Sequence, residues 1–176
     1  PTTGRVEAGG RDLAEWDLEH WRAQLCYMPQ EPFFLAGTVR DNLVMANPGL
    51  SESRLNALIR LCGLRRFLDL SEKGLDAPVV DAGRDLPLGI RRRMALVRAL
   101  AGEGPLLLLD EPTEGLDAEG AQAVYAALNE LVREGRSLVA VSADPGILRA
   151  AHLVLELGAG PAALTVQRPF AGESAP

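Results

Sequence analysis

LLLLDEPTEGLD, residues 106–117, runs four leucines directly into two adjacent acids. The leucine run is short and follows a Gly-Pro pair, which favours a fully buried strand of a parallel sheet over a helix. Asp110 and Glu111 then lie at the carboxyl end of this strand, the edge of an α/β sheet where ligands bind. Pro112 ends the strand because it has no N–H to donate. We therefore expect a polar functional site at this edge.

The composition is that of an ordinary soluble globular protein. The chain of 176 residues is 47% hydrophobic and 24% charged, and it is long enough for one domain with a real core. A net charge of −6 argues against a general nucleic-acid or anionic-membrane surface. Cys26 and Cys62 lack ligand spacing, so we expect two buried reduced thiols. No apolar run is long enough to span a bilayer, and no signal peptide opens the chain. Because the chain starts at Pro1 rather than Met, we expect the natural sequence to begin earlier.

Strand and helix patterns alternate along the chain. Short strands are expected near residues 5–8, 25–28, 106–110, 137–142 (a second buried strand), 152–157 and 163–167, and helices over residues 90–101, 121–132 and from residue 144. This alternation predicts an α/β fold with a mostly parallel sheet and helices on both faces. Residues from about 38 to 90 interrupt it with a helical pattern and a loop over 74–89. We expect a core of residues 1–37 and 91–168, an inserted α-helical subdomain of residues 38–90, and a loose tail of residues 169–176.

Several stretches, in order, resemble the nucleotide-binding domain of ATP-binding-cassette (ABC) proteins. YMPQEPFFLAGTVRDNL is similar to the Q-loop and its sequel in exporter-type cassettes, and DAPVVDAGRDL stands where the loop before the signature belongs. LPLGIRRRMALVRAL stands at the signature and its helix, and LLLLDEPTEGLD matches the Walker B strand and D-loop. The resemblance runs from PTTGRV to about residue 157. It implies a P-loop NTPase (RecA-like) fold, with ATP and Mg²⁺ as cofactors.

The resemblance also assigns roles to single residues. Asp110 holds Mg²⁺ through water, and Glu111 is the catalytic residue that polarises the water attacking the γ-phosphate, as Mg²⁺ and phosphoryl chemistry require. Gln30 reaches the metal or the water and couples the site to a membrane partner. Asp117 belongs to the D-loop that touches the opposite subunit. Gly89 is the glycine of the signature that this chain retains.

Three departures from the family pattern predict reduced hydrolysis. No Gly-x-x-x-x-Gly-Lys-Ser/Thr phosphate loop occurs in these residues, and the family places it upstream of PTTGRV; we expect this chain alone to bind ATP poorly and not to be active. The signature Leu-Ser-Gly-Gly-Gln is here altered at Pro87, Leu88 and Ile90, which lose a hydroxyl, a close backbone approach and an amide. Ala143 takes the place of the switch histidine.

Two classes of function follow. The first is the ATPase cassette of an exporter-like ABC transporter at the cytoplasmic face of the cell membrane, fused upstream to a transmembrane domain and paired with a second cassette, identical or different. Nucleotide-driven dimer closure would move the transmembrane helices, with slow hydrolysis. The alternative is a catalytically impaired regulatory or structural cassette that pairs with a competent one. Soluble ABC ATPases acting on DNA or ribosomes are a weaker option because no basic face or coiled coil appears, so no nucleic-acid partner is expected.

Other conspicuous residues receive structural interpretations. Asp117 is expected to cap the helix that follows it. The three arginines 91–93 are expected on a solvated helix face. His20 and His152 have no partners at ligand spacing, and the two tryptophans, residues 16 and 21, are expected to serve packing.

Overall fold

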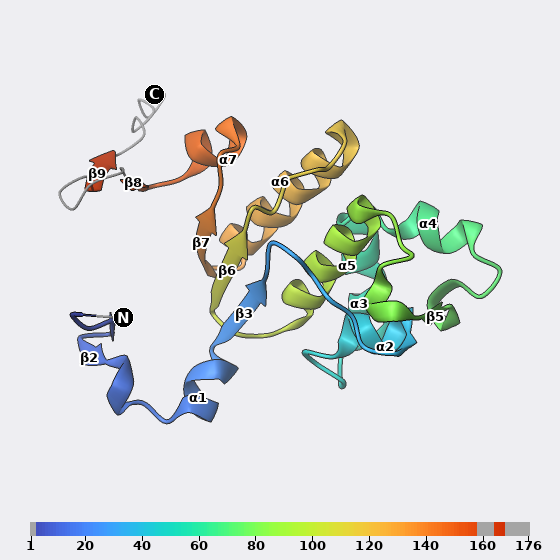
Figure 1. Ribbon diagram of the computed structural model, residues 1–176, viewed down its shortest axis with the longest axis horizontal. Helices are drawn as coiled ribbons and strands as arrows, with labels where there is room; N and C mark the ends of the chain where they lie inside the picture. The colour runs from blue at the N-terminus through green and yellow to red at the C-terminus, as the bar shows by residue number, and fades with distance from the viewer. Residues whose placement is uncertain (1–2, 158–163, 168–176) are drawn as a thin grey trace.

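The computed structural model describes residues 3–157 and 164–167, so the predicted tail of residues 169–176 lies outside the described part (Figure 1). The strands are β1 (Glu7–Ala8), β2 (Arg11–Asp12), β3 (Leu25–Met28), β4 (Gly37–Thr38), β5 (Pro78–Val79), β6 (Leu106–Asp110), β7 (Ser137–Val141), β8 (Val154–Leu157) and β9 (Leu164–Gln167). The helices are α1 (Leu18–Ala23), α2 (Val39–Val44), α3 (Glu52–Leu61), α4 (Arg65–Leu70), α5 (Leu88–Ala101), α6 (Ala118–Arg133) and α7 (Pro145–Ala150). None of the helices in the described ranges is long and apolar enough to cross a membrane.

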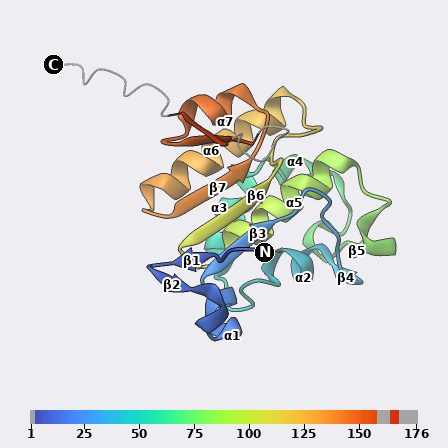
Figure 2. The same cartoon turned by 60° about the vertical axis from the view of Figure 1, so that its left-hand side comes forward.

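A three-stranded parallel sheet in the order β3-β6-β7 carries the fold. Its two crossovers run through α5 and α6 and advance in the same direction across the sheet. Because parallel crossovers are right-handed, both helices belong on the same face, and Figure 2 shows α5 and α6 behind the three strands. The predicted α/β class with a parallel sheet is therefore confirmed, and the two crossover helices, α5 and α6, lie on one face of this sheet.

The strands alternate between a covered and an open face. Leu107 and Leu109 of β6 are buried on the covered face, whereas Leu106 and Leu108 are half-buried, so the prediction of a fully buried strand is wrong. The second predicted buried strand, β7, is mostly exposed, with Val139 and Val141 54% and 61% accessible on the open face. The physical reason is that β7 forms one edge of this sheet and, within the described residues, its open face has no covering layer.

The helices of residues 39–70 enclose a core that continues into α5. Leu55, Leu58 and Ile59 of α3 are fully buried in one apolar cluster with α5 and β6. Thr38 and Asp41 form a reciprocal capping box at the start of α2, which satisfies two orphan N–H groups. The predicted loop over residues 74–89 is partly wrong, because β5 pairs with β4 and α5 begins at Leu88. The division of the chain into a core and a helical subdomain stays a prediction.

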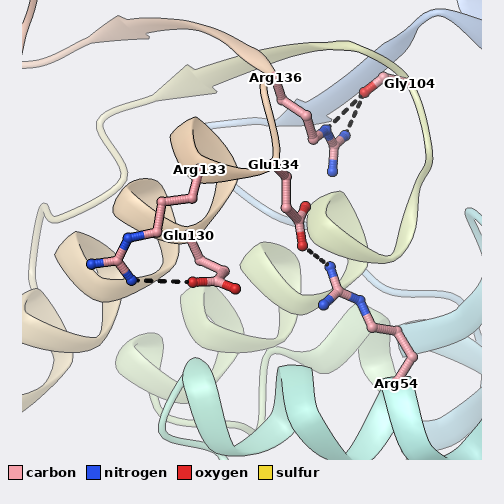
Figure 3. A network of polar contacts seen from close by, with 6 residues as sticks. All are labelled: Arg54, Gly104, Glu130, Arg133, Glu134 and Arg136. Atoms are coloured by element: carbon pink, nitrogen blue, oxygen red, sulfur yellow. Dashed lines mark hydrogen bonds and ion pairs between the residues drawn. The ribbon is translucent and has the colours of Figure 1, made fainter.

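Two arginines link segments that are distant in the sequence: one joins α3 to the end of α6, and the other joins the start of β7 to the turn before β6 (Figure 3). Arg54 of α3 pairs with Glu134, just after α6, at 2.6 Å. Arg136 donates to the carbonyl oxygen of Gly104, with its Nε atom at 3.0 Å from that oxygen. The first contact links the helical segment to α6. The second fixes the turn that leads into β6, at the amino-terminal edge of the sheet.

The remaining predictions of packing concern cysteines and aromatic residues. Cys26 and Cys62 are buried and unpaired, as predicted. Trp16 and Trp21 contact one another with ring centroids 5.7 Å apart, and His20 stacks on Trp16 at 6.1 Å. The aromatic residues thus pack on each other at the start of the chain, next to the β1–β2 hairpin.

Candidate functional site

The carboxyl ends of β3 and β6 bring the predicted site residues to one edge of the sheet. Met28, the last residue of β3, pairs with Leu109, so Gln30 and Asp110 both leave the sheet at the same level. Asp110 is the last residue of β6 and pairs with Val141 of β7. Asp110 is half-buried and Gln30 is exposed. Parallel strands therefore juxtapose the two residues predicted to serve the metal.

Glu111 is held in an unusual backbone conformation. Its φ of +45° lies in the left-handed region, which is costly for a residue with a side chain. The N–H of Glu111 donates to the carbonyl of Val141 at 2.9 Å. The carbonyl of Glu111 accepts from Nη1 of Arg92 at 2.7 Å. Both peptide groups of Glu111 are therefore fixed, and with them the direction in which its carboxylate leaves the backbone.

The amide of Gln30 is engaged by a residue that was not predicted from the sequence, Glu114. Nε2 of Gln30 donates to Oε2 of Glu114 at 3.2 Å, and Nη2 of Arg92 donates to the same oxygen at 2.7 Å. These hydrogen bonds, first from Arg92 and then from Gln30, hold the pKa of Glu114 below its ordinary value. Glu114 is therefore a charged acceptor shared by a helix residue and the Q-loop position.

The prediction that the three arginines 91–93 form a solvated helix face is wrong. The side chain of Arg92 is only 5% exposed and that of Arg93 only 12%. Arg93 donates to the carbonyl of Gly63 at 2.8 Å and to Asp117 at 2.9 Å. The reason is that acceptors of two turns, one between β6 and α6 and one between α3 and α4, lie against α5. Buried guanidinium groups are tolerated only when so paired.

Asp117 caps α6, as predicted. Its Oδ1 accepts from the N–H of Gly120 at 2.8 Å, which satisfies an orphan donor of the first helical turn. That hydrogen bond is the largest contribution to a pKa held below the ordinary aspartate value, and the nearby Arg93 adds to it. The predicted contact with an opposite subunit stays a prediction.

The signature stretch places apolar groups at the start of α5. Pro87 is the N-cap and has no side-chain hydrogen bond, while Leu88 begins the helix and is 41% exposed. The Leu88 side chain lies against Gly115, where a Cβ atom would come within 3.1 Å of it. At Gly89 a Cβ atom would meet Leu116 at an ordinary 3.7 Å, so packing within this chain does not require glycine there. The N-terminus of α5 is thus lined by hydrocarbon.

The position of the switch histidine, Ala143, is exposed between β7 and α7. Its neighbour Asp144 caps α7 by accepting from the N–H of Gly146 at 2.6 Å. Asp144 also accepts from the hydroxyl of Tyr125 in α6. Burial raises the pKa of Asp144, but the hydrogen bonds from Tyr125, Thr113 and the helix amides outweigh it and lower the pKa. This corner is occupied by a structural cap.

The oxygen donors at this edge fit Mg²⁺. Among residues 3–157 and 164–167 no group of three or more His, Cys, Asp and Glu side chains is arranged to hold a metal ion. Mg²⁺ keeps several waters and takes only one or two carboxylates from a protein, so Asp110 suffices as the charged donor. Because Nε2 of Gln30 donates to Glu114, the Oε1 atom is the end of the amide that remains for a metal or a water.

A cleft of about 540 Å³ opens beside Gln30, on the side of α5 and Glu114. Its lining comprises Gln30, Glu31, Pro32, Phe33, Ala82, Arg84, Leu88, Arg91, Arg92 and Glu114. Asp110 and Glu111 lie outside this lining. The cleft therefore adjoins the strand-end residues through Gln30 and Glu114.

Comparisons of sequence and of structure relate the chain to known proteins. The family model described as ABC transporter matches residues 1–114. The glutathione/L-cysteine transport system ATP-binding/permease protein CydC of Escherichia coli is 34% identical over 155 residues, which is 88% of this chain and 27% of that protein. The mycobactin import ATP-binding/permease protein IrtB of Mycolicibacterium smegmatis is 38% identical over 160 residues, 91% of this chain and 28% of that protein.

A solved structure shows the same arrangement of elements. The structure of a bacterial Atm1-family ABC exporter with ATP bound superposes with a TM-score of 0.79 at 25% identity, over 87% of this chain and 27% of that one. The chain thus spans about a quarter of the length of these similar proteins.

Proposed function

The chain belongs to the ABC transporter family and is an exporter-like nucleotide-binding domain; on that premise we propose that it is the ATP-hydrolysing cassette of a transporter in which nucleotide-driven closure of two cassettes moves transmembrane helices. The observation that carries the proposal is the meeting of Gln30, Asp110 and Glu111 at the carboxyl ends of β3 and β6. Oxygen donors and a carboxylate at such an edge are what phosphoryl transfer to water needs.

Each of the three residues has a separate task. Asp110 orients the water shell of the metal, and Glu111 accepts a hydrogen bond from the attacking water and draws its proton away. Gln30 contributes Oε1 to the metal or to that water. Mg²⁺, when bound with ATP, neutralises charge on the β- and γ-phosphates. The family's phosphate loop supplies the remaining phosphate contacts.

Hydrolysis is expected to be slow. Pro87 and Leu88 remove a hydroxyl and a close backbone approach from the surface that would face a partner's nucleotide, and Ala143 removes a donor from the chain's own site. Loss of one positioned donor costs on the order of 10²–10³ in rate in other enzymes. In a dimer, each nucleotide site combines the strand-end residues of one cassette with the signature of the other. A different partner cassette can therefore restore one of the two lost elements in each site, but not both.

The proposed partners are a second cassette, identical or different, and a transmembrane domain on the same polypeptide. The Escherichia coli and Mycolicibacterium smegmatis proteins, both named ATP-binding/permease proteins, support this fusion. The cassette then works at the cytoplasmic face of the membrane. A net charge of −6 supports a partner other than nucleic acid.

The test is ATP hydrolysis by the complete protein in lipid. Glu111→Gln should abolish turnover while nucleotide binding persists, because the amide keeps the shape of the side chain but is not a base. The combined substitutions Pro87→Ser, Leu88→Gly and Ala143→His should raise kcat at least tenfold over the unmodified protein. This threshold is set low, because restoring a single positioned donor is worth about 10²–10³ in rate.

A second function, a regulatory or structural cassette, is favoured by the four altered positions 87, 88, 90 and 143. It predicts that Glu111→Gln leaves the turnover of the assembled transporter unchanged, because the partner cassette carries out hydrolysis. Unchanged turnover in both Glu111→Gln and the triple variant rules out the first proposal in favour of this one.

A further inference from the structure

We propose that Arg92 and Glu114 form a positioning pair that fixes the carboxylate of Glu111 and the amide of Gln30 relative to one another. Arg92 holds the backbone of Glu111, and Glu114 holds the side chain of Gln30. The effect on turnover rests on the proposed function. The pair itself rests on contacts within this chain.

The guanidinium of Arg92 donates hydrogen bonds to two acceptors. Arg92 is the fifth residue of α5, and its side chain is 5% exposed. Nη1 lies 2.7 Å from the Glu111 carbonyl oxygen, and Nη2 lies 2.7 Å from Oε2 of Glu114. Among the described residues its Nε atom is buried without a hydrogen-bond partner. A buried arginine with an unpaired nitrogen is costly, so the two short charge-assisted bonds are what keep it at this position.

Arg92 bonds the first and the last residue of the turn formed by residues 111–114. The N–H of Glu114 donates to the carbonyl of Glu111 at 3.2 Å, so residues 111–114 close on themselves. Arg92 bonds the first residue of this turn through its carbonyl and the fourth through its carboxylate. Because Glu111 has φ of +45°, its peptide groups would rotate if it relaxed to an ordinary conformation. Such a rotation would redirect the Glu111 carboxylate away from the end of β6.

Glu114 also fixes the position of the Gln30 amide. One oxygen, Oε2, accepts from both Arg92 and Gln30, so the position of the Gln30 amide depends on where Arg92 places Glu114. Gln30 follows β3 and Glu111 follows β6, and the pair links these two strand ends through side chains.

A plain structural ion pair would predict something different. If Arg92 only stabilised the fold, its loss would lower thermal stability and leave the kinetics of the folded fraction unchanged. The informative variant is therefore Arg92→Lys, since lysine keeps the charge but is a point donor that cannot span two acceptors in the fork geometry of arginine. Glu114→Ala removes the second acceptor and leaves the bond from Arg92 to the Glu111 carbonyl.

Arg136→Lys is the matched control. Arg136 also bonds a backbone carbonyl, that of Gly104, through two of its nitrogens (Figure 3). It directly precedes β7, at the amino-terminal edge of the sheet, whereas the site residues follow the carboxyl ends of β3 and β6. It has no contact with Glu111, Gln30 or Glu114 in the described structure. Its replacement reports the cost of losing a partly buried guanidinium without disturbing the pair.

The experiment uses the complete protein in lipid, with two readouts. In steady-state ATP hydrolysis, Arg92→Lys should lower kcat about 10-fold to 100-fold, as small misplacements of reacting groups do, with KM for ATP changed less than about twofold. Arg136→Lys should match the unmodified kcat. In structures of the nucleotide-free variants, Arg92→Lys should show Glu111 at negative φ and no hydrogen bond between Gln30 and Glu114. Glu114→Ala should keep φ positive, because the bond from Arg92 to the Glu111 carbonyl remains, while the Gln30 amide loses its acceptor.

The two readouts separate the failures. If Arg92→Lys keeps Glu111 at positive φ with Gln30 still bonded to Glu114, or if its kcat equals that of Arg136→Lys in an active protein, the positioning pair is overturned. If the unmodified protein does not hydrolyse ATP, the proposed function fails, and the conformation of Glu111 in the variant still decides the claim about Arg92.

Discussion

Replacing Leu107 by alanine should show that burial on this sheet is one-sided. Leu107 is 0% exposed in the central strand β6 and faces the layer of α5 and α6. Alanine removes three carbons there, and the surrounding helices and strands cannot close the space, so the free energy of unfolding should fall by about 2–5 kcal/mol. For a chain of this length, a loss of about 3 kcal/mol lowers Tm by roughly 6–12 °C. The next residue, Leu108, supplies a matched comparison.

Leu108 belongs to the same strand but points to the open face, where it is half-buried. Leu108→Ala makes the same chemical change at the same strand propensity, and it should cost about 1 kcal/mol because the side chain already contacts water. Urea denaturation of the 176-residue chain, followed by far-UV circular dichroism, measures both losses at a common m value. Equal losses for the two variants would refute the assignment of faces on which the description of the sheet rests.

Two further predictions concern charges. A double-mutant cycle of Arg54→Ala and Glu134→Ala should give a coupling energy of no more than about 1 kcal/mol that shrinks with added salt, since both side chains are partly exposed; a larger, salt-independent coupling would mean that the pair is shielded from water. Asp117 has a lowered pKa in the folded state, so its stabilising effect is fully present above its unfolded pKa of about 3.9 and is lost as the pH falls through the folded pKa. Asp117→Asn, which keeps the cap but not the charge, should therefore lose less stability between pH 6 and pH 2 than the unmodified chain, and parallel pH curves would contradict this.

The sequence was sufficient for the features that depend on local order. A short leucine run followed by Asp110 and Glu111 predicted both a strand and a polar strand end, and Asp117 before an apolar stripe predicted a cap; the structure has all of these. Register between parallel strands then brings Gln30 to the same edge, as the motif order implied. Each of these inferences needs only neighbours along the chain and the geometry of a parallel sheet.

The positioning pair was beyond this kind of inference because it depends on how α5 crosses the turn after β6. One signal was present: Arg92 stands in helical register with Ala95, Leu96 and Ala99, all buried, at spacings of three, four and seven residues. An arginine on such a stripe has to find acceptors, and Glu114 is an acid in the turn that packs there. A run of three arginines is typical of a solvated helix face, and it predicted such a face here instead.

The exposure of β7 was likewise not readable from its residues. SLVAVS is rich in branched apolar side chains and is typical of a buried strand. Burial is decided by what lies against each face of the sheet, and the amino-acid sequence of one strand does not specify its neighbours. The same composition therefore serves an edge strand whose open face carries Val139 and Val141.

The backbone conformation of Gly115, next to Leu88, limits which mutations this turn can accept. With leucine at position 88, any side chain at 115 would come within 3.1 Å of it and would also have to adopt a φ of +68°. Because Leu88 is 41% exposed, the end of its side chain can move by the few tenths of an ångström that a Cβ atom at 115 requires, so the positive φ is the stricter of the two constraints. Position 115 is therefore expected to keep glycine whichever residue stands at 88, because the backbone strain of a side chain there does not depend on its neighbour.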